Sequence, residues 1–427
     1  MSRKIAVVGG GIAGLGAAWL LSHRHQVTLI EAGDYVGGHT NTVDFPASDG
    51  VVPVDTGFIV YNEPNYPHLT GLFNQLNVPT KESDMSFAFA ARHLDLEYAG
   101  DHVGTLFAQP RNLLRPSFWG MLRDIVRFNR QARRALAEGV NREATLGELL
   151  DQWGLGEGFR RFYLLPMSGA IWSCPQNDML RFPAQSFLQF FRNHGLIQIT
   201  GGPQWRTVDG GGRAYVNRML GAIHRVRIAQ PVQRIQTGAN GVSVETANGA
   251  EDFDDVVIAT HADQALRVLD SPSTEESEIL GAFGYARNEA WLHTDERLMP
   301  RRRRVWASWN HLTHERRDGK APISVTYWMN RLQSLPTRDD VFVSLNPPEP
   351  PAGDRVYRHM TYDHPVLDRA AAAAQRRLTA IQGQRGLWFC GSYCGYGFHE
   401  DALASAVDVA HRLGVAPPWQ IDREAAA

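Results

Sequence analysis

The sequence has few cysteines and no long uninterrupted hydrophobic run. Its three cysteines, at positions 174, 390 and 394, form neither a zinc-binding pattern nor a disulfide framework in a chain of 427 residues. No window offers the roughly 18 consecutive apolar residues that a membrane-spanning helix needs. The first apolar run begins within the opening five residues, which leaves no room for a signal peptide. We therefore expect a cytoplasmic protein without a metal site.

The chain also lacks an excess of charge of either sign. Its formal net charge of −2 creates no field that would favour nucleic acid, so no nucleic-acid partner is expected. Lysine is scarce: Lys4, Lys81 and Lys320 are the three lysines, and arginine supplies the other basic residues. With 43% hydrophobic residues, the chain can bury a large core and form two or more domains.

The first twenty residues carry the pattern of a nucleotide-binding turn. The apolar, β-branched run 5–8 predicts a buried parallel strand, and the apolar residues at 17–21 predict a helix. Between them the glycines follow the G-x-G-x-x-G spacing, which permits a tight turn, close approach of a pyrophosphate and packing of the helix on the strand. The free amides of the helix N-terminus favour phosphate. The predicted contacts are Gly9, Gly11, Ile12, Ala13 and Gly14.

A second predicted strand, "QVTLIEA", ends in Glu31, about 20 residues past the glycines, where a carboxylate can accept ribose hydroxyls. Strand, turn, helix, second strand and terminal acid thus occur in the order that a dinucleotide fold requires. Glu31 and Ala32 are predicted to contact the nucleotide.

The next segments resemble the flavin-containing amine oxidase and phytoene desaturase superfamily. "GDYVGGHTNTV" is similar to the R-x-GG-R segment that follows the acid in that superfamily, with His39 where the family usually has arginine. "VDTGFIVY" is similar to its Asp-x-Gly segment near the flavin ring. The resemblance implies FAD as the cofactor. It implies contacts from Gly37, Gly38, His39, Asp55, Thr56 and Gly57.

Later segments also resemble that superfamily, which implies that they return to the cofactor. The triplet Gly210–Gly212 resembles its GG-x-x-x-L segment. A second site for NAD(P)H there is discounted, because the final glycine of the fingerprint is missing and no apolar strand precedes the triplet. Asn-Gly turns are predicted at 240–241 and 248–249. The resemblance implies cofactor contacts from Val232, Ala259, Thr260 and His261.

Near the C-terminus, "GLWFCG" predicts the last parallel strand and "GYGFHEDALASAV" leads into a helix with 3.6-residue periodicity. The resemblance implies that the N-terminus of this helix faces the N1–C2=O edge of the flavin, where its dipole stabilises negative charge. For Glu400 and Asp401 two roles stay open, binding of ribityl hydroxyls or capping of the helix. The implied contacts are Gly391, Gly397, Phe398, Glu400 and Asp401.

Together these observations predict an α/β protein with two domains. Residues 1–75, 205–270 and 375–420 are expected to form a discontinuous, glutathione-reductase-like Rossmann FAD-binding domain. Residues 76–204 and 271–374 are expected to form an α+β substrate domain with a mixed sheet and helices, and residues 421–427 a tail. The aromatic stretches "FYLLPMSGAIWSCP" and "FPAQSFLQFFRNHGL" are predicted to be core more readily than ligand pocket.

Residues 111–136 predict an amphipathic helix with a basic face, and two interpretations remain open. Such a helix can lie on an anionic membrane surface, which would place the protein peripherally at the inner face of the membrane. It can equally be a surface helix with a solvated basic face, which is the commoner case. The run of arginines at 301–304 allows the same two interpretations.

The sequence resembles, over nearly its full length, that of a narrower subgroup. This subgroup is the predicted FAD-binding proteins commonly encoded beside cyclopropane-fatty-acid-synthase-like methyltransferases. This resemblance implies a fatty acyl substrate, methylated or unsaturated and carried on phospholipid, with desaturation towards furan fatty acids as the reaction. A methyltransferase is the implied protein partner. Two alternatives stay open: an amine or amino-acid oxidase, and a flavoprotein that presents lipid to a methyltransferase.

The residues near the expected ring limit the chemistry. Amine oxidases of the superfamily use a lysine beside flavin N5, whereas Lys320 is the lone lysine in the corresponding half of this chain and is expected in an exposed turn. The segment around Cys394 does not match the tethering segment of monoamine oxidases, so FAD is predicted to be non-covalent. We expect hydride transfer to the flavin, with positioning as the main contribution of the protein. The candidate bases are His399, Glu400 and His194.

Overall fold

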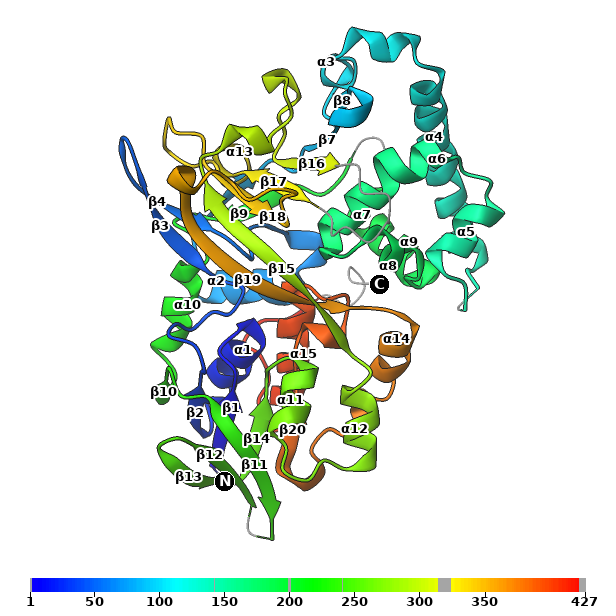
Figure 1. The fold of residues 1–427 in the computed structure, drawn as a ribbon. Helices are drawn as coiled ribbons and strands as arrows, with labels where there is room; N and C mark the ends of the chain where they lie inside the picture. The colour runs from blue at the N-terminus through cyan, green and yellow to red at the C-terminus, as the bar shows by residue number, and fades with distance from the viewer. Residues whose placement is uncertain (1, 142, 199–200, 240, 314–323, 422–427) are drawn as a thin grey trace.

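The computed structural model describes residues 2–141, 143–198, 201–239, 241–313 and 324–421 (Figure 1). Its lower half in Figure 1 is built on a five-stranded sheet with the order β10-β2-β1-β14-β20, and every pair in it is parallel. The sheet draws strands from three distant parts of the chain, as the sequence predicts. Their bounds are β1 (Lys4–Val8), β2 (Gln26–Ile30), β10 (Arg225–Arg227), β14 (Asp255–Ile258) and β20 (Leu387–Phe389).

Two helices pack together against this sheet, α1 (Ile12–Leu21) and α15 (His399–Arg412). Every residue of α1 is buried, which fits a helix between a sheet and a second helix. Their close approach depends on Gly16, where an added Cβ would lie 2.6 Å from Leu403 Cδ1. The first and last helices of the fold are thereby brought side by side (Figure 1).

A small antiparallel sheet, β11 (Val232–Gly238), β12 (Gly241–Thr246) and β13 (Gly249–Phe253), flanks the parallel sheet. The turn predicted at 248–249 joins β12 to β13, whereas Asn240 of the other predicted turn lies outside the described residues. The helices that complete this half are α2 (Pro67–Gln75), α10 (Arg213–Leu220), α11 (Ala262–Val268), α12 (Thr274–Leu280) and α14 (Arg369–Gln375). α12 and most of α14 fall within residues 271–374, which the sequence analysis assigned to the substrate domain.

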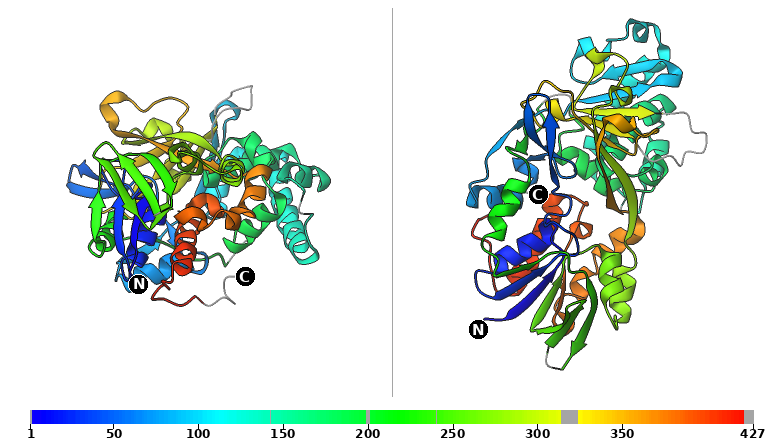
Figure 2. Two further views of the ribbon diagram at one scale, coloured as in Figure 1. Left: turned by 90° about the horizontal axis from the view of Figure 1, so that it is seen from below. Right: turned by 60° about the vertical axis from the view of Figure 1, so that its left-hand side comes forward.

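The other half contains a seven-stranded mixed sheet in the order β19-β15-β18-β17-β16-β7-β8. Its pairs are antiparallel except for the parallel pair β16/β7. The two sheets confirm the predicted fold class, and the right-hand view of Figure 2 shows the two halves stacked along the length of the molecule. The strands are β7 (Phe87–Ala91), β8 (Leu96–Ala99), β15 (Gly284–His293), β16 (Trp309–Thr313), β17 (Val325–Trp328), β18 (Phe342–Leu345) and β19 (Val356–Val366).

Helices form a layer beside this sheet (Figure 1). Residues 110–114 form a 3-10 turn and α4 begins at Pro116, so the helix predicted over 111–136 starts five residues later. Proline explains the boundary, because its fixed φ suits the first turn of a helix. No described helix combines the length and hydropathy that a membrane crossing requires. The layer comprises α3 (Val103–Leu106), α4 (Pro116–Glu138), α5 (Leu146–Gln152), α6 (Glu157–Phe159), α7 (Leu165–Trp172), α8 (Gln176–Leu180) and α9 (Ala184–Asn193).

Two small sheets lie between the halves. The hairpin β3 (Thr42–Ala47) and β4 (Gly50–Asp55) packs its apolar side chains in the same cluster as residues of β15, β17 and β18. The other sheet has the order β5 (Tyr61–Asn62), β9 (Trp205–Val208) and β6 (Thr80–Ser83). A short strand, β9, precedes the glycine triplet at 210–212, but Arg206 and Thr207 make up half of it, so it is not the apolar strand of a second nucleotide site. It pairs antiparallel with β5 and β6, outside the parallel sheet.

The carboxylate of Asp55, at the end of β4, connects three distant segments. It accepts hydrogen bonds from the Thr42 hydroxyl, from the backbone amide of Gly212 at 3.0 and 3.1 Å, and from Gln333 Nε2 at 3.0 Å. The backbone amide of Asp55 donates in turn to Gln333 Oε1 at 3.0 Å. Burial raises the pKa of Asp55 to about 7, while the Thr42 hydroxyl and the Gly212 amide lower it. The side chain is 1% exposed, so these partners replace water.

Replacement of Asp55 by asparagine is expected to destabilise the protein. All partners of the carboxylate are donors, so the NH₂ group of asparagine faces a donor whichever way the amide is turned. This unsatisfied contact should lower the free energy of unfolding by about 1–3 kcal/mol. The measurement is urea-induced unfolding above pH 7, where the wild-type carboxylate is ionised. Asp44→Asn is the control, since Asp44 forms an exposed ion pair with Arg213 and should cost little. Equal unfolding midpoints for the two variants would contradict the role of Asp55.

Candidate cofactor site

The glycine-rich turn lies at the carboxyl end of β1 and runs beside the second pair of glycines. Gly9 has a φ of +102°, a conformation that suits glycine, and its amide donates to Ile30 O at 2.9 Å. The amide of Gly37 donates to Gly10 O at 2.9 Å, and Gly11 pairs with Gly37 as a parallel bridge. The two glycine segments predicted to approach a pyrophosphate are therefore in direct contact.

The surroundings of Gly11 fit a phosphate group. A Cβ added at Gly11 would meet none of the described atoms within 4 Å, whereas one at Gly14 would lie 1.8 Å from Gly9 O. Gly14 is thus packed against the chain, and Gly11 borders open space at the start of α1. Among the described residues no side chain caps α1, and its first turn contains no acidic residue. The free amides of this turn can donate to an anion.

The carboxylate of Glu31 lies at the same edge of the sheet. It accepts the backbone amides of Gly10 and Gly33, each at 2.6 Å, which fix its orientation. The segment that leads to Val232 runs alongside, because the amide of Gln230 donates to Glu31 O at 3.0 Å. The predicted ribose-binding acid and the predicted adenine-contacting segment are therefore neighbours. Ala32, next to Glu31, is exposed.

Three histidines from distant segments gather where the parallel sheet meets the β15/β19 ribbon. The His39 ring lies 6.5 Å from that of His261, at the start of α11, and 5.1 Å from that of His364 in β19. Tyr362 lies 5.0 Å from His39, and Tyr285 stacks on His261 at 4.4 Å. The Nε2 atom of His39 is buried and has no hydrogen-bond partner among the described residues. An unpaired buried ring nitrogen of this kind fits a polar ligand atom, as a donor or an acceptor according to its tautomer.

These histidines are neutral at physiological pH. Burial lowers the pKa of His39 well below its ordinary value, and the neighbouring His364 and His261 lower it further. Burial also lowers the pKa of His364, to about 4, and that of His261. The cluster therefore offers hydrogen-bond donors without the fixed charge of an arginine. Within the described residues no group of three His, Cys, Asp or Glu side chains is arranged to hold a metal ion.

His399 begins α15 and points into a buried network. Its ring stacks on Phe58 at 3.8 Å, and Nε2 lies 3.0 Å from Thr40 Oγ1 and 2.9 Å from the Tyr215 hydroxyl. Thr40 and Tyr215 also hydrogen-bond to each other at 2.5 Å. Burial lowers the pKa of His399 to about 3, so the ring is neutral. These contacts hold the ring, and its role as a base stays a prediction.

The two carboxylates of the first turn of α15 are both engaged with backbone amides. Glu400 reaches the neighbouring helix α2 and accepts the amides of His68 at 2.8 Å and Leu69 at 3.0 Å. Asp401 accepts the amide of Phe398 at 2.9 Å and so caps its own helix. Burial raises the pKa of Glu400 to about 7 and that of Asp401 to about 6. Asp401 therefore matches the capping role left open by the sequence, whereas Glu400 binds the first turn of α2 and not its own helix.

His194, at the end of α9, belongs to an aromatic cluster. Its ring stacks on Phe190 at 3.9 Å and lies 5.8 Å from Trp205 and 6.4 Å from Phe398, the residue that precedes α15. The Nδ1 atom lies 3.0 Å from Phe190 O. Burial lowers the pKa of His194 to about 4. The structure thus brings His194 near the start of α15, although its contacts are those of a core residue.

The remaining predicted contacts line the same edge of the sheet. Ala259 follows β14, and its carbonyl lies 2.8 Å from where a Cβ of Gly9 would be. The Thr56 hydroxyl lies 2.7 Å from the Tyr362 hydroxyl, and the amide of Gly391 donates to Ser405 Oγ of α15 at 2.9 Å. A Cβ at Gly57 would lie 2.3 Å from His39 O. Within the described part of the chain, five predicted positions show no hydrogen bond to another segment at this edge: Ile12, Ala13, Gly38, Thr260 and Gly397.

Several residues of the site escaped the sequence analysis. Thr40 and Tyr215 lie within segments that resemble family motifs but were not singled out, and Tyr362 and His364 belong to no recognised motif. A weak signal exists in the alternation of Tyr362 and His364 along β19, since residues two apart in a strand share a face. This alternation does not indicate which distant segment the face of β19 that carries Tyr362 and His364 contacts.

The described lysines and cysteines supply neither a cation nor an activated thiol to this arrangement. Lys81 forms an ion pair with Asp209 at 3.1 Å in the vicinity of β6, and Lys320 lies outside the described residues. Burial raises the pKa of the Cys394 thiol to about 12 and that of Cys390 well above its ordinary value. Neither thiol is therefore an activated nucleophile.

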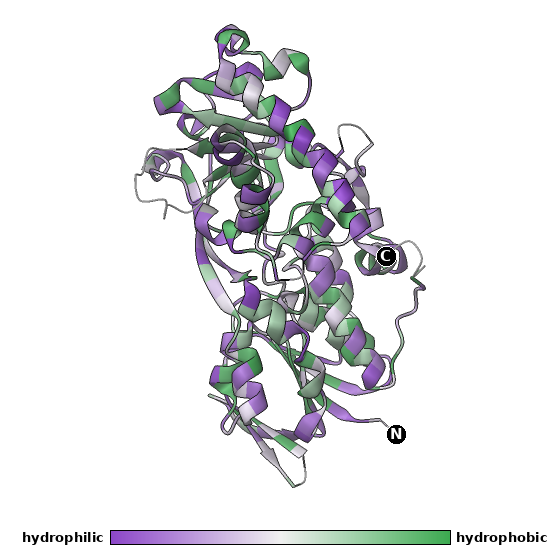
Figure 3. Ribbon diagram, turned by 90° about the vertical axis from the view of Figure 1, so that its right-hand side faces the viewer, coloured by the Kyte–Doolittle hydropathy of each residue, from purple (hydrophilic) through white to green (hydrophobic). Residues whose placement is uncertain are grey.

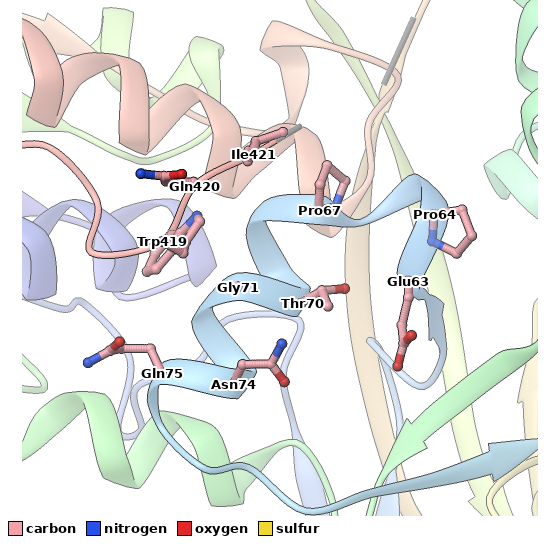
Figure 4. A pocket seen from close by; sticks show the side chains of 10 residues that line it. All are labelled: Glu63, Pro64, Pro67, Thr70, Gly71, Asn74, Gln75, Trp419, Gln420 and Ile421. Carbon is pink, nitrogen blue, oxygen red and sulfur yellow. The ribbon is translucent and has the colours of Figure 1, made fainter. Parts of the chain in front are cut away.

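A surface hollow of about 500 Å³ lies apart from this edge, between α2 and the C-terminal segment (Figure 4). Trp419 covers Gly71, where a Cβ would lie 2.4 Å from Trp419 Cγ. None of the residues predicted to bind cofactor or substrate lines this hollow. It is therefore a feature of helix α2 and not part of the candidate site.

Comparison with known proteins agrees with the geometry. The family model described as flavin containing amine oxidoreductase matches residues 12–341. A crystal structure of a CLA-producing fatty acid isomerase from P. acnes superposes with a TM-score of 0.69 at 14% identity, over 97% of this chain and 99% of that one. Putrescine oxidase bound to putrescine superposes with a TM-score of 0.68 at 15% identity, with the same coverage. At such identities the superpositions show a shared fold.

Sequence relatives match over shorter stretches. An FAD-dependent oxidoreductase of Emericella nidulans is 40% identical over 87 residues, which span 20% of this chain and 17% of that protein. The chain thus aligns with less than a fifth of the length of this curated relative.

The two glycines of the turn are expected to respond differently to substitution. Gly14→Ala forces a Cβ onto Gly9 O and should lower the stability of the protein by several kcal/mol. Gly11→Ala introduces a methyl group into open space, so it should leave the unfolding midpoint of the cofactor-free protein unchanged and weaken binding of FAD about tenfold or more. Urea unfolding and titration of FAD fluorescence measure the two effects. A Gly11→Ala variant that binds FAD like the wild type would contradict this placement.

Glu400 is expected to make stability depend on pH. Its pKa in the folded protein, about 7, exceeds its ordinary value of 4.5. The contribution of Glu400 to the free energy of unfolding is therefore complete below about pH 4.5 and is lost as the pH rises through 7. In Glu400→Gln the slope of unfolding free energy against pH should flatten between these values, with the part due to Asp401 retained. The exposed Glu82→Gln is the control and should keep the wild-type slope. An unchanged slope in Glu400→Gln would refute the assignment.

Proposed function

The chain belongs to the flavin-containing amine oxidoreductase family and is an FAD-dependent oxidoreductase, and from that premise we propose that it desaturates a fatty acyl chain. The substrate is a methylated or unsaturated chain carried on phospholipid. A double bond forms as two hydrogens leave, one as a hydride and one as a proton. When bound, FAD supplies the two-electron acceptor for the hydride. The protein binds the cofactor, orients the acyl chain and excludes water.

The observation that carries this proposal is an aromatic wall against the segment before α15. The rings of Trp172 and Phe190 lie 4.5 Å apart, and Phe190 stacks on Phe398 at 5.0 Å. The Trp172 indole donates to Tyr396 O at 3.2 Å, which ties α7 to this segment. Trp172 and Phe190 are themselves buried, so the segment before α15 has an apolar surrounding, which favours an acyl chain over a charged substrate.

The polar groups near this wall also favour an uncharged substrate. The histidines at 39, 194, 261, 364 and 399 all have lowered pKa values, so they add no positive charge. The carboxylates of Glu400 and Asp401 are engaged with backbone amides and are not free to pair with an ammonium group. A substrate amine would find no free carboxylate there among these residues, whereas a hydrocarbon chain needs none.

Each part of the site then has a distinct task. The turn around Gly11 and the start of α1 would hold the pyrophosphate, and Glu31 the ribose. The unpaired Nε2 of His39 would donate to a cofactor oxygen as a neutral group. The N-terminus of α15 would favour negative charge at the flavin edge that faces it.

Two other functions are supported by particular observations. An amine or amino-acid oxidase is favoured by the likeness of the fold to putrescine oxidase, while the fatty acid isomerase of the same fold supports an acyl substrate. A flavoprotein that presents lipid to a methyltransferase is favoured by the resemblance to proteins encoded beside such enzymes. The commitment of all three candidate bases to structural contacts is compatible with this third function.

Reduction of the flavin without oxygen distinguishes these functions. The FAD-loaded protein is mixed anaerobically with phospholipids that carry unsaturated or methylated chains, with the free fatty acids, and with polyamines and amino acids. We expect the visible flavin absorbance to bleach with a lipid and the recovered acyl chain to lack two hydrogens by mass spectrometry. Bleaching with amines alone, with peroxide released in air, would establish the oxidase. Lipid binding without bleaching for any compound would establish the presenting protein.

A further inference from the structure

Exposed hydrophobic side chains are concentrated in one part of the molecule. Of the ten large hydrophobic residues that are exposed in the described part of the chain, six lie within residues 94–126. Leu114 is 85% exposed, Val103 73% and Trp119 49%. Single exposed apolar residues are ordinary, but a group of this kind marks a site of interaction. The six are Leu94, Val103, Leu113, Leu114, Trp119 and Val126, and we call the face that carries them the α3–α4 surface.

The α3–α4 surface lies at the end of the molecule farthest from the parallel sheet (Figure 1). It comprises the turn before β8, α3, the 3-10 turn 110–114 and the first half of α4. Figure 3 shows green, hydrophobic stretches alternating with purple, hydrophilic ones along this end and down α4. Nothing else in the described chain covers these side chains.

A packed aromatic base supports the exposed residues. The Trp119 ring lies 5.6 Å from that of Phe107, and Phe107 lies 5.8 Å from the buried Phe118. Phe118 in turn lies 5.5 Å from Tyr98 of β8. The Trp119 indole also donates to Leu113 O at 2.9 Å, which joins α4 to the 3-10 turn. Trp119 and the two leucines are therefore held outward by a continuous core.

Arginines outnumber acidic residues among the apolar side chains, although Asp95, next to Leu94, forms an ion pair with Arg111. Residues 111–134 contain seven arginines and a single acid, Asp124, which is 3% exposed and pairs with Arg127 at 2.8 Å and with Arg123 at 3.5 Å. Arg130 and Arg133 have no ion pair with any described residue. Along α4 the outward positions follow steps of four and three residues, which place them on one face. The residues on this exposed face of α4 are Trp119, Arg123, Val126, Arg130 and Arg133.

We propose that the α3–α4 surface docks on an anionic lipid bilayer. Leucine and tryptophan side chains are suited to the boundary between headgroups and acyl chains, and a helix with a basic face and apolar residues can lie along it. Unpaired arginines add attraction to anionic headgroups, worth about fivefold in binding for each one near the surface. A protein partner fits less well, because the cores of protein interfaces are depleted in charge and here arginines alternate with the apolar residues.

This inference goes beyond the proposed function and does not depend on it. Vesicle binding is measured without turnover, so a failure to bind and a failure to desaturate are separate results. The two agree in one respect, since a chain carried on phospholipid must be met at a bilayer.

The experiment is co-sedimentation of the full-length, FAD-loaded protein with two kinds of vesicle. One contains phosphatidylcholine alone and the other contains phosphatidylcholine with phosphatidylglycerol. We expect binding to the anionic vesicles, weaker binding to the neutral ones, and a loss of binding as salt rises, because screening shortens the reach of the arginines.

Two variants test the surface, each with a matched control. Leu114→Glu combined with Trp119→Glu should weaken binding about tenfold or more, whereas Val51→Glu, at an exposed valine of the β3–β4 hairpin, should not change it. Reversal of Arg123, Arg130 and Arg133 to glutamate should weaken binding to a similar extent. The control reverses three exposed arginines elsewhere, at positions 225, 338 and 376, and so changes the net charge by the same amount.

Three outcomes would overturn the proposal. The first is no binding to either vesicle by a protein that retains FAD. The second is equal loss of binding in the two arginine variants, which would make net charge and not this surface responsible. The third is self-association that Trp119→Glu abolishes while vesicle binding is unaffected, which would identify the surface as a contact between copies of the chain. Circular dichroism and retention of FAD confirm that each variant is folded.

Discussion

A single buried carboxylate holds the two halves of this protein in register. Asp55 receives hydrogen bonds from Thr42, from the glycine triplet through Gly212 and from Gln333 of the other half. Removed from water, it needs these partners to offset the cost of its burial. Because Gly212 precedes α10, and α10 carries Tyr215, the position of the network around His399 also follows from this contact.

The candidate site has neutral histidines at a position where the family usually has a charged arginine. His39, His261 and His364 come from three separate segments, and burial lowers the pKa of each of them. The helix N-termini of α1 and α15 provide the positive end of a dipole at either end of the same edge. An elongated anionic cofactor with a ring system can therefore be held without lysine or a cationic clamp at this position.

The sequence predicted most of the nucleotide half because its signals are local. The turn at Gly9–Gly14, the acid at Glu31 and the last helix each occur within a short segment whose spacing has a mechanical reason. The other half offered less, since its mixed sheet joins strands such as β7 and β16 that are more than 200 residues apart. The start of α4 was placed five residues too early, because the apolar periodicity extends into the 3-10 turn before Pro116.

By itself the sequence determined the family, the FAD cofactor and the class of fold, because backbone turns that cradle phosphate leave a pattern of glycines and strands that can be read in order. The tertiary structure alone decided the use of individual side chains. It turned Glu400 towards α2, placed His364 beside His39 and left Leu114 and Trp119 uncovered. These outcomes follow from contacts between residues far apart in the chain, and no local spacing records which distant partner a side chain will meet.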